Sequence, residues 1–247
     1  MLSDAIIKRK SVRKYSSKKF SDAVKAEIAE KIKELSPMFD DAATYFKLVP
    51  ENLIRDELSG MLVTAPYYII ISSDGKDGDL ENIGYMAEQL VLKLTEMGIG
   101  TCFCGMGKPK QSSSINGVYG ITLALGYPAE SESFRQSRSD FKRKNIEDFL
   151  LGDKESDFYL PFIEAARLAP SAINRQPVLF EMNVSSIDIY RKKPVMEKMD
   201  SMQRVDAGIA AAHIFAVASD KGYGVEFFKK GTELREKYIY VISIKLV

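Results

Sequence analysis

The sequence contains few of the residues that build metal sites and disulfide frameworks. It has one histidine, His213, and two cysteines, Cys102 and Cys104, with a single residue between them. This spacing fits neither a C-x-x-C redox motif nor a zinc site, and two cysteines do not make a disulfide framework. We therefore expect buried thiols in a reducing cytoplasm, a packed His213, and no metal site.

Long apolar runs and a charge imbalance are also missing. No stretch approaches the roughly 20 apolar residues that cross a bilayer, and Ala5 to Ile7 is too short for the core of a signal peptide. The 247 residues carry 35 Lys and Arg against 34 Asp and Glu, which leaves a formal net charge of +1. Proteins that coat nucleic acid usually have a strongly basic domain. We therefore expect neither nucleic acid nor a membrane as a partner.

Positive charge is instead concentrated near the first residues. KRKSVRKY, Lys8 to Tyr15, places five basic residues within eight. Arg9 and Arg13 are four apart and share a face of a helix or its extension, and Ser11 adds a hydroxyl between them. Guanidinium groups match the geometry of phosphate oxygens. In a nearly neutral protein this cluster predicts a small, fixed anion, with a solvated run of charge as the alternative.

Two segments of the chain resemble each other at a constant offset of 124 residues. Each predicts an apolar helix that ends at Gly-x-Gly and is followed by a strand. The matched pairs are Gly84 with Gly208, Ala87 with Ala211, Leu90 with Ile214, Gly98 with Gly222, Gly100 with Gly224, and Phe103 with Phe227. A weaker match at an offset of 133 pairs Pro37 with Pro170. The pattern predicts an internal duplication, with chance similarity as the alternative.

Periodicity and breaker residues predict helices that alternate with strands, which favours a layered α+β fold. Further helices are expected over 21–35 and 157–168, and strands over 66–72, 121–125, 178–184 and 238–246. The polar segment 131–144 has the composition of a linker. We place the boundary near Asp153, which gives a first half of 1–153 and a shorter second half of 154–247, packed together as one unit.

Two motifs resemble those of the flavin-dependent nitroreductase family. RKSVRKY, Arg9 to Tyr15, is similar to the family's Arg-Arg-Ser-x-Arg-x-Phe signature. APSAINRQPVLF, Ala169 to Phe180, is similar to its A-P-S-x-x-N-x-Q-P-W-x-F segment. Weaker likenesses lie at 82–103, at 124–128 (ALGYP) and at 143–150 (RKNIEDFL). The resemblance covers most of the chain and implies the α+β fold of FMN-dependent nitroreductases.

The resemblance also implies which residues hold FMN. The basic signature would contact the phosphate and ribityl chain, through Arg9, Lys10, Ser11 and Arg13. The later segment would line the flavin, through Pro170, Ser171, Ala172, Asn174 and Gln176. A second phosphate contact would come from Arg143 and Lys144. The alternatives are a loop with ordinary turn chemistry for the later segment and a solvated charge pair for Arg143 and Lys144.

The order of these motifs departs from that of the family. There the Pro-Ser segment follows the basic signature by a few dozen residues, whereas the matching place here, around Pro37, lacks the Asn and Gln. Family members are homodimers with flavins at the subunit interface. The resemblance therefore implies an internal pseudo-dimer, able to act as a monomer, with one complete flavin site and one degraded site. The family's Trp is Val178 here.

The implied function is that of a nitroreductase-type oxidoreductase. NADH or NADPH would donate hydride through FMN to an electron-poor acceptor such as a nitroaromatic or a quinone. No catalytic side chain is expected, because the flavin carries the chemistry. Arg13 or Lys14 would place positive charge near the flavin, and a backbone N–H of Gly105 to Gly107 would face it. The alternatives are an FMN-binding or flavin-sensing protein with little turnover, and an interaction protein with an acidic partner.

Overall fold

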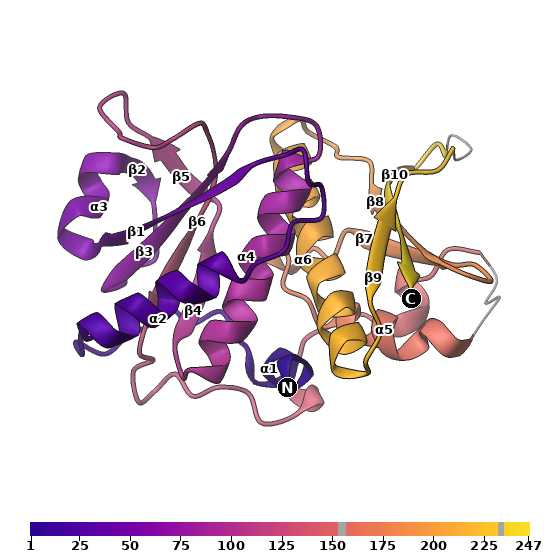
Figure 1. Ribbon diagram of the computed structural model, residues 1–247, viewed down its shortest axis with the longest axis horizontal. Helices are drawn as coiled ribbons and strands as arrows, with labels where there is room; N and C mark the ends of the chain where they lie inside the picture. The colour runs from indigo at the N-terminus through magenta and orange to yellow at the C-terminus, as the bar shows by residue number, and fades with distance from the viewer. Residues whose placement is uncertain (153–156, 232–234) are drawn as a thin grey trace.

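The computed structural model describes residues 1–152, 157–231 and 235–247, and places two sheets on either side of a central pair of helices (Figure 1). The first sheet contains, in spatial order, β1 (Thr44–Pro50), β3 (Tyr67–Ser73), β6 (Val118–Gly126) and β4 (Gly100–Cys104). The second contains β7 (Val178–Met182), β8 (Ile187–Lys192), β10 (Tyr238–Leu246) and β9 (Val225–Phe228). Neighbouring strands in both sheets run antiparallel. The predicted α+β class is confirmed.

The two halves share one order of elements. A helix, two strands, a long helix and two strands follow each other in each half, and both sheets have the spatial order first, second, fourth, third. The shorter helices are α2 (Asp22–Lys33) and α5 (Leu160–Arg167), and the long central helices are α4 (Asp79–Glu96) and α6 (Lys198–Asp220). The first half adds α3 (Glu51–Glu57) and a ribbon of β2 (Leu58–Met61) with β5 (Met106–Pro109).

This shared topology is what the predicted pseudo-dimer requires, and its origin by duplication stays a prediction. The predicted boundary at Asp153 lies outside the described residues. Within the described ranges, no helix is both long and apolar enough to cross a membrane.

Local chemistry explains the elements that the sequence predicts. Helix α2 begins where the Ser21 side chain accepts a hydrogen bond from the Val24 N–H at 3.3 Å, as an N-cap does. Every residue of β3 is buried, because the sheet packs on both faces. Tyr67 of this strand stacks on Phe20 with ring centroids 4.5 Å apart, so this tyrosine is a core residue. Strand β10 has the predicted bounds.

The segment 131–144 is not a linker, and this prediction is wrong. It folds back over α1 (Leu2–Lys8), where the Arg135 N–H donates to the Lys8 carbonyl at 3.0 Å. Glu132 pairs with Lys10 at 2.6 Å. A short 3₁₀ helix, Arg138–Asp140, is closed by a capping box. The polar side chains that suggested a solvated linker are used for these local bonds instead.

Candidate functional site

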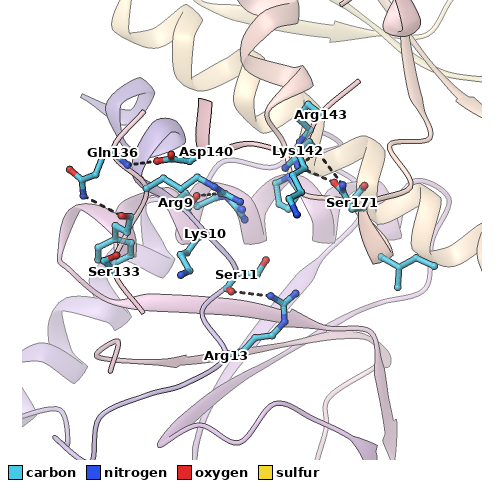
Figure 2. A pocket seen from close by; sticks show the side chains of 15 residues that line it. Arg9, Lys10, Ser11, Arg13, Ser133, Gln136, Asp140, Lys142, Arg143 and Ser171 are labelled. Atoms are coloured by element: carbon cyan, nitrogen blue, oxygen red, sulfur yellow. Dashed lines mark hydrogen bonds between the residues drawn. The ribbon is translucent and has the colours of Figure 1, made fainter. Parts of the chain in front are cut away.

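A pocket of about 650 Å³ lies where three distant segments of the chain meet (Figure 2). The segments are 9–13, 133–143 and 170–174, so both halves contribute walls. A pocket of this size falls in the usual range for small ligands and cofactors. The structure brings eight of the predicted site residues together in its lining, namely Arg9, Lys10, Ser11, Arg13, Arg143, Pro170, Ser171 and Asn174.

The other three predicted residues lie beside the pocket rather than in its lining. The Gln176 side-chain oxygen accepts from the Lys144 N–H at 2.9 Å. The Ala172 N–H donates to a carboxylate oxygen of Asp206 at 3.0 Å. These three residues therefore hold the pocket walls in place through bonds within the protein.

The basic signature is positioned by the end of α1 and the edge of β4. The Arg9 N–H closes the last turn of α1 onto the Ala5 carbonyl at 2.8 Å. Ser11 then bridges Thr101 of β4 in parallel, and the Val12 N–H donates to the Thr101 carbonyl at 2.9 Å. The Val12 side chain is fully buried. Because side chains alternate along an extended chain, burial of Val12 leaves its two neighbours free to line the pocket.

Four arginines line this pocket, and three of them, Arg9, Arg135 and Arg143, are buried or half-buried. Arg135 donates to the Arg9 carbonyl and lies 4.1 Å from the Phe141 ring centroid. Arg143 lies 5.5 Å from the same ring. Burial lowers the pKa of Arg135 and of Arg143 to about 10, and the nearby charge of Arg9 is the second cause. Partly buried guanidinium groups whose pKa is lowered by burial and by a neighbouring positive charge mark a site where an anion is favoured.

Two of these arginines also have hydrogen-bonding capacity left over. The Nε atoms of Arg9 and Arg143 are buried and find no hydrogen-bond partner in the described part of the chain. A buried donor without a partner costs free energy. A multivalent oxygen acceptor inside the pocket is the kind of ligand that satisfies such donors.

A buried acid–histidine pair stands behind Arg9. Arg9 Nε lies 3.8 Å from Glu88 Oε1, and the same oxygen lies 2.8 Å from His213 Nε2. His213 Nδ1 lies 2.8 Å from the Ala165 carbonyl oxygen. Because a carbonyl only accepts, Nδ1 carries a hydrogen, so Nε2 and Glu88 share a further proton between them. His213 is therefore a packed core residue, as the sequence predicts. Arg9, in front of this pair, is also buried, and burial lowers its pKa.

The wall at 170–176 is strained. Ile173, Asn174 and Gln176 have φ values of 45°, 57° and 54°, a left-handed region that such residues rarely adopt. Two bonds hold the loop in this form: Arg143 Nη1 donates to Asn174 Oδ1 at 2.9 Å, and the Gln176 N–H donates to Ser171 Oγ at 2.9 Å. Ile173 is 83% exposed at the pocket edge.

Sequence reasoning missed the wall formed by 133–142. Its lining residues are Ser133, Phe134, Arg135, Gln136, Asp140 and Lys142. One signal was available, since 131–144 carries five basic residues in fourteen and two acidic ones, Glu132 and Asp140. A backbone N–H of Gly105 to Gly107 was expected to face the flavin, but these residues do not line this pocket. Those glycines line a separate hollow of about 410 Å³, together with Met61, Met106 and Met202.

Comparison with known proteins gives matches of family and of fold. Residues 1–218 match the model of a family described as "Putative TM nitroreductase". A nitroreductase structure from Thermotoga maritima is similar, with 25% identity and a TM-score of 0.69 over 99% of this chain and 93% of that one. A nitroreductase family protein from Clostridium difficile has 15% identity and a TM-score of 0.50 over 63% of this chain and 98% of that one.

A nitroreductase from Desulfitobacterium hafniense, solved with bound FMN, has 17% identity and a TM-score of 0.44 over 58% of this chain and 97% of that one. No curated protein matches the chain. The family match spans most of the sequence and agrees with the fold. The chain belongs to the TM nitroreductase family.

Proposed function

We propose that the pocket between the two halves binds FMN, with the phosphate held by Arg9, Arg135 and Arg143. The carrying observation is that Arg9, Arg135 and Arg143 lie together at a partly buried place. Burial first, and the nearby charge of Arg9 second, lower the pKa of Arg135 and of Arg143. Two buried N–H donors of Arg9 and Arg143 lack a hydrogen-bond partner in the described part of the chain. The pocket volume and the mixture of basic, hydroxyl and amide side chains also fit a mononucleotide. Membership of the nitroreductase family supports a flavin over other phosphorylated ligands.

The chain's own residues orient the ligand and exclude water from it. The guanidinium cluster fixes the anionic end, and Ser11 and Lys10 extend the polar wall next to it. Ser171 and Asn174 present hydroxyl and amide groups from the other half, on a loop whose geometry is set by Arg143. FMN, when bound, supplies the hydride and electron chemistry.

The finer proposal is an NAD(P)H-dependent oxidoreductase of nitroreductase type. NADH or NADPH would be the donor, and an electron-poor nitroaromatic or quinone the acceptor. A side-chain acid or base is not needed for hydride transfer. Asp140, the carboxylate in the pocket lining, already accepts from the Gln136 and Ser137 N–H groups at 2.8 and 3.1 Å. One pocket per chain, a pseudo-dimeric architecture and a cytoplasmic location remain predictions.

Absorbance spectroscopy tests the proposal in two stages. Purified protein, or protein reconstituted with FMN, is expected to show the flavin bands with one FMN per chain. Anaerobic mixing with NADH or NADPH is then expected to bleach these bands, and a nitroaromatic or quinone to restore them. A protein that binds FMN but is not bleached by either donor would be a flavin-binding protein without this activity. A protein that takes up no FMN at micromolar concentrations would contradict the proposal as a whole.

A further inference from the structure

One buried carboxylate of the central helix α6 forms a hydrogen bond to the strained pocket wall at 170–176. Asp206 of α6 is 4% exposed. Its two carboxylate oxygens lie 3.0 and 3.2 Å from the Ala172 backbone nitrogen. This backbone N–H belongs to the loop at 170–176, in which three residues have left-handed φ values. The carboxylate therefore stabilises a backbone conformation that is costly by itself.

The first half contains an equivalent hydrogen bond between its long helix and the loop that corresponds to 170–176. Asn82 of α4 accepts with Oδ1 from the Met38 N–H at 2.6 Å and from the Phe39 N–H at 3.2 Å. Asn82 and Asp206 are 124 residues apart, and Phe39 and Ala172 are 133 apart, the same offsets that relate the two repeated segments. The two halves thus use the same bond from the long helix to the loop, with a neutral amide in one and an acid in the other.

The amide and the acid differ in what they can donate. Asn82 Nδ2 donates to the Phe39 and Ala42 carbonyls at 3.2 and 2.7 Å, so its loop is held by both ends of the amide. An ionised carboxylate only accepts. The bond from Asp206 to the Ala172 N–H therefore depends only on the ability of the carboxylate to accept, which depends on its charge. Arg143 and Ser171 hold the same loop through separate bonds.

We propose that Asp206 is a positioning residue for the pocket wall at 170–174 and that its ionisation tightens this wall. The consequence for ligand binding rests on the proposed flavin site, whereas the coupling between Asp206 and the loop rests on geometry alone. With the carboxylate ionised, its charge-assisted bond to Ala172 holds the left-handed residues in place. With the carboxyl group protonated, the bond weakens and the wall opens more readily.

The surroundings place this change in the neutral pH range. Burial raises the pKa of Asp206 to about 7, and the Ala172 N–H opposes the rise. Charged groups on the elements around this part of α6 have partners of their own. These pairs are Arg204 with Glu81 and Asp79, Arg191 with Asp200, His213 with Glu88, Arg143 with Asn174, and Arg175 with the Met199 sulfur.

The amide signal of Ala172 in an NMR spectrum tests the coupling without any ligand. In the wild-type protein this signal is expected to shift with pH, with a midpoint near 7, because its hydrogen-bond acceptor changes charge. Asp206→Asn keeps an acceptor of the same shape and is expected to remove the shift. Asp140→Asn is the matched control, since Asp140 is a carboxylate of the same pocket that bonds other N–H groups; the titration should survive it.

FMN affinity at pH 6 and pH 8 tests the functional consequence. The ratio of wild-type to Asp206→Asn affinity is expected to rise at least threefold from pH 6 to pH 8. The Asp206→Asn variant serves as the reference because the phosphate of FMN itself titrates near pH 6. That titration changes the affinity of both proteins and cancels in their ratio. An Ala172 signal that does not titrate, or that titrates equally in Asp206→Asn, overturns the inference, as does an affinity ratio independent of pH. Absence of FMN binding in the wild type would instead refute the proposed function, and the amide titration would still decide the coupling.

Discussion

Gly84 of α4 and Gly208 of α6 occupy the same crossing point of the two central helices, one from each side. A Cβ atom on Gly84 would lie 2.1 Å from the Val205 carbonyl oxygen, and one on Gly208 would lie 1.9 Å from the Glu81 carbonyl oxygen. The two glycines are 124 residues apart, and so are Glu81 and Val205. The contact is therefore reciprocal, as in a twofold interface between identical subunits.

Replacing either glycine should separate the helices. Gly84→Ala and Gly208→Ala are each expected to lower the free energy of unfolding by about 1–3 kcal/mol or more, because a methyl group there overlaps the backbone of the opposite helix. Urea denaturation measures the change. Gly231→Ala is the control, since no atom of the described residues lies within 4 Å of a Cβ built there. Equal stability of all three variants would show that the helices do not meet as closely as described.

Arg135 is the arginine whose importance the sequence did not predict. Arg135→Ala is expected to weaken FMN binding by about 1.5–3 kcal/mol, the scale of a lost hydrogen bond to a charged group. Arg138→Ala is the matched control, because Arg138 belongs to the same segment, is exposed and does not line the pocket. Isothermal titration of the apoprotein with FMN gives both values. Similar losses in the two variants would point to general electrostatic attraction in place of a phosphate contact.

Glu88 supplies buried negative charge beside Arg9. Glu88→Leu should leave the guanidinium without its counter-charge and His213 without its partner at Nε2, and is expected to lower stability by about 3–5 kcal/mol. Glu88→Gln, which keeps a polar side chain of the same shape next to His213 Nε2, should lose less. Denaturation curves of the three proteins check this order, and a Gln variant as unstable as the Leu variant would contradict it.

The single histidine makes the proton arrangement directly observable. The bond from Nδ1 to the Ala165 carbonyl requires a hydrogen on that nitrogen. A nitrogen-15 spectrum of the imidazole, free of overlap because the chain has one histidine, should therefore show Nδ1 protonated. An Nδ1 atom without hydrogen would refute the described network.

Asp206 should make folding stability depend on pH in an unusual direction. Its pKa is about 7 in the folded protein, because burial raises it from the ordinary aspartate value of 3.8. Between these values the folded state binds more protons than the unfolded state, so the free energy of unfolding falls as pH rises from about 4 to 7. This contribution is fully present below pH 4 and lost above pH 7.

Asp206→Asn removes this pH dependence. Relative to the wild type, the variant is expected to gain about 2–4 kcal/mol of stability between pH 5 and pH 8, on the scale of 1.4 kcal/mol for each unit of pKa. Chemical denaturation at the two pH values measures the difference. A difference that stays constant, or that changes sign, would show that Asp206 ionises as an exposed acid does.

The sequence predicted elements whose signals are local. Helix α2 was predicted from Ser21 and the apolar spacing that follows it, and β10 was predicted as a closing strand over 238–246. The signature residues Arg9 to Arg13 were found because they form a continuous motif. Strand β8 and the ribbon of β2 with β5 were missed, because short strands with charged or small residues carry no clear period.

The wall containing Arg135 and the role of Asp206 could not be predicted for a different reason. Arg135 belongs to a polar segment whose composition is that of a linker, and only its fold over α1 brings it to Arg9. Asp206 is one of three aspartates in α6, and its partner Ala172 lies 34 residues away. Both roles depend on tertiary contacts that no local pattern encodes.

Because residues 9–13 and 170–174 belong to one polypeptide yet form opposite walls of the pocket, a substitution alters one wall and leaves the facing wall as it was. In a homodimer with two identical clefts, the same substitution would appear twice. Selection on this chain can therefore change the segment at 9–13 and the segment at 170–174 separately. Engineering of ligand preference can follow the same route, by changing 170–174 while the guanidinium cluster is kept intact.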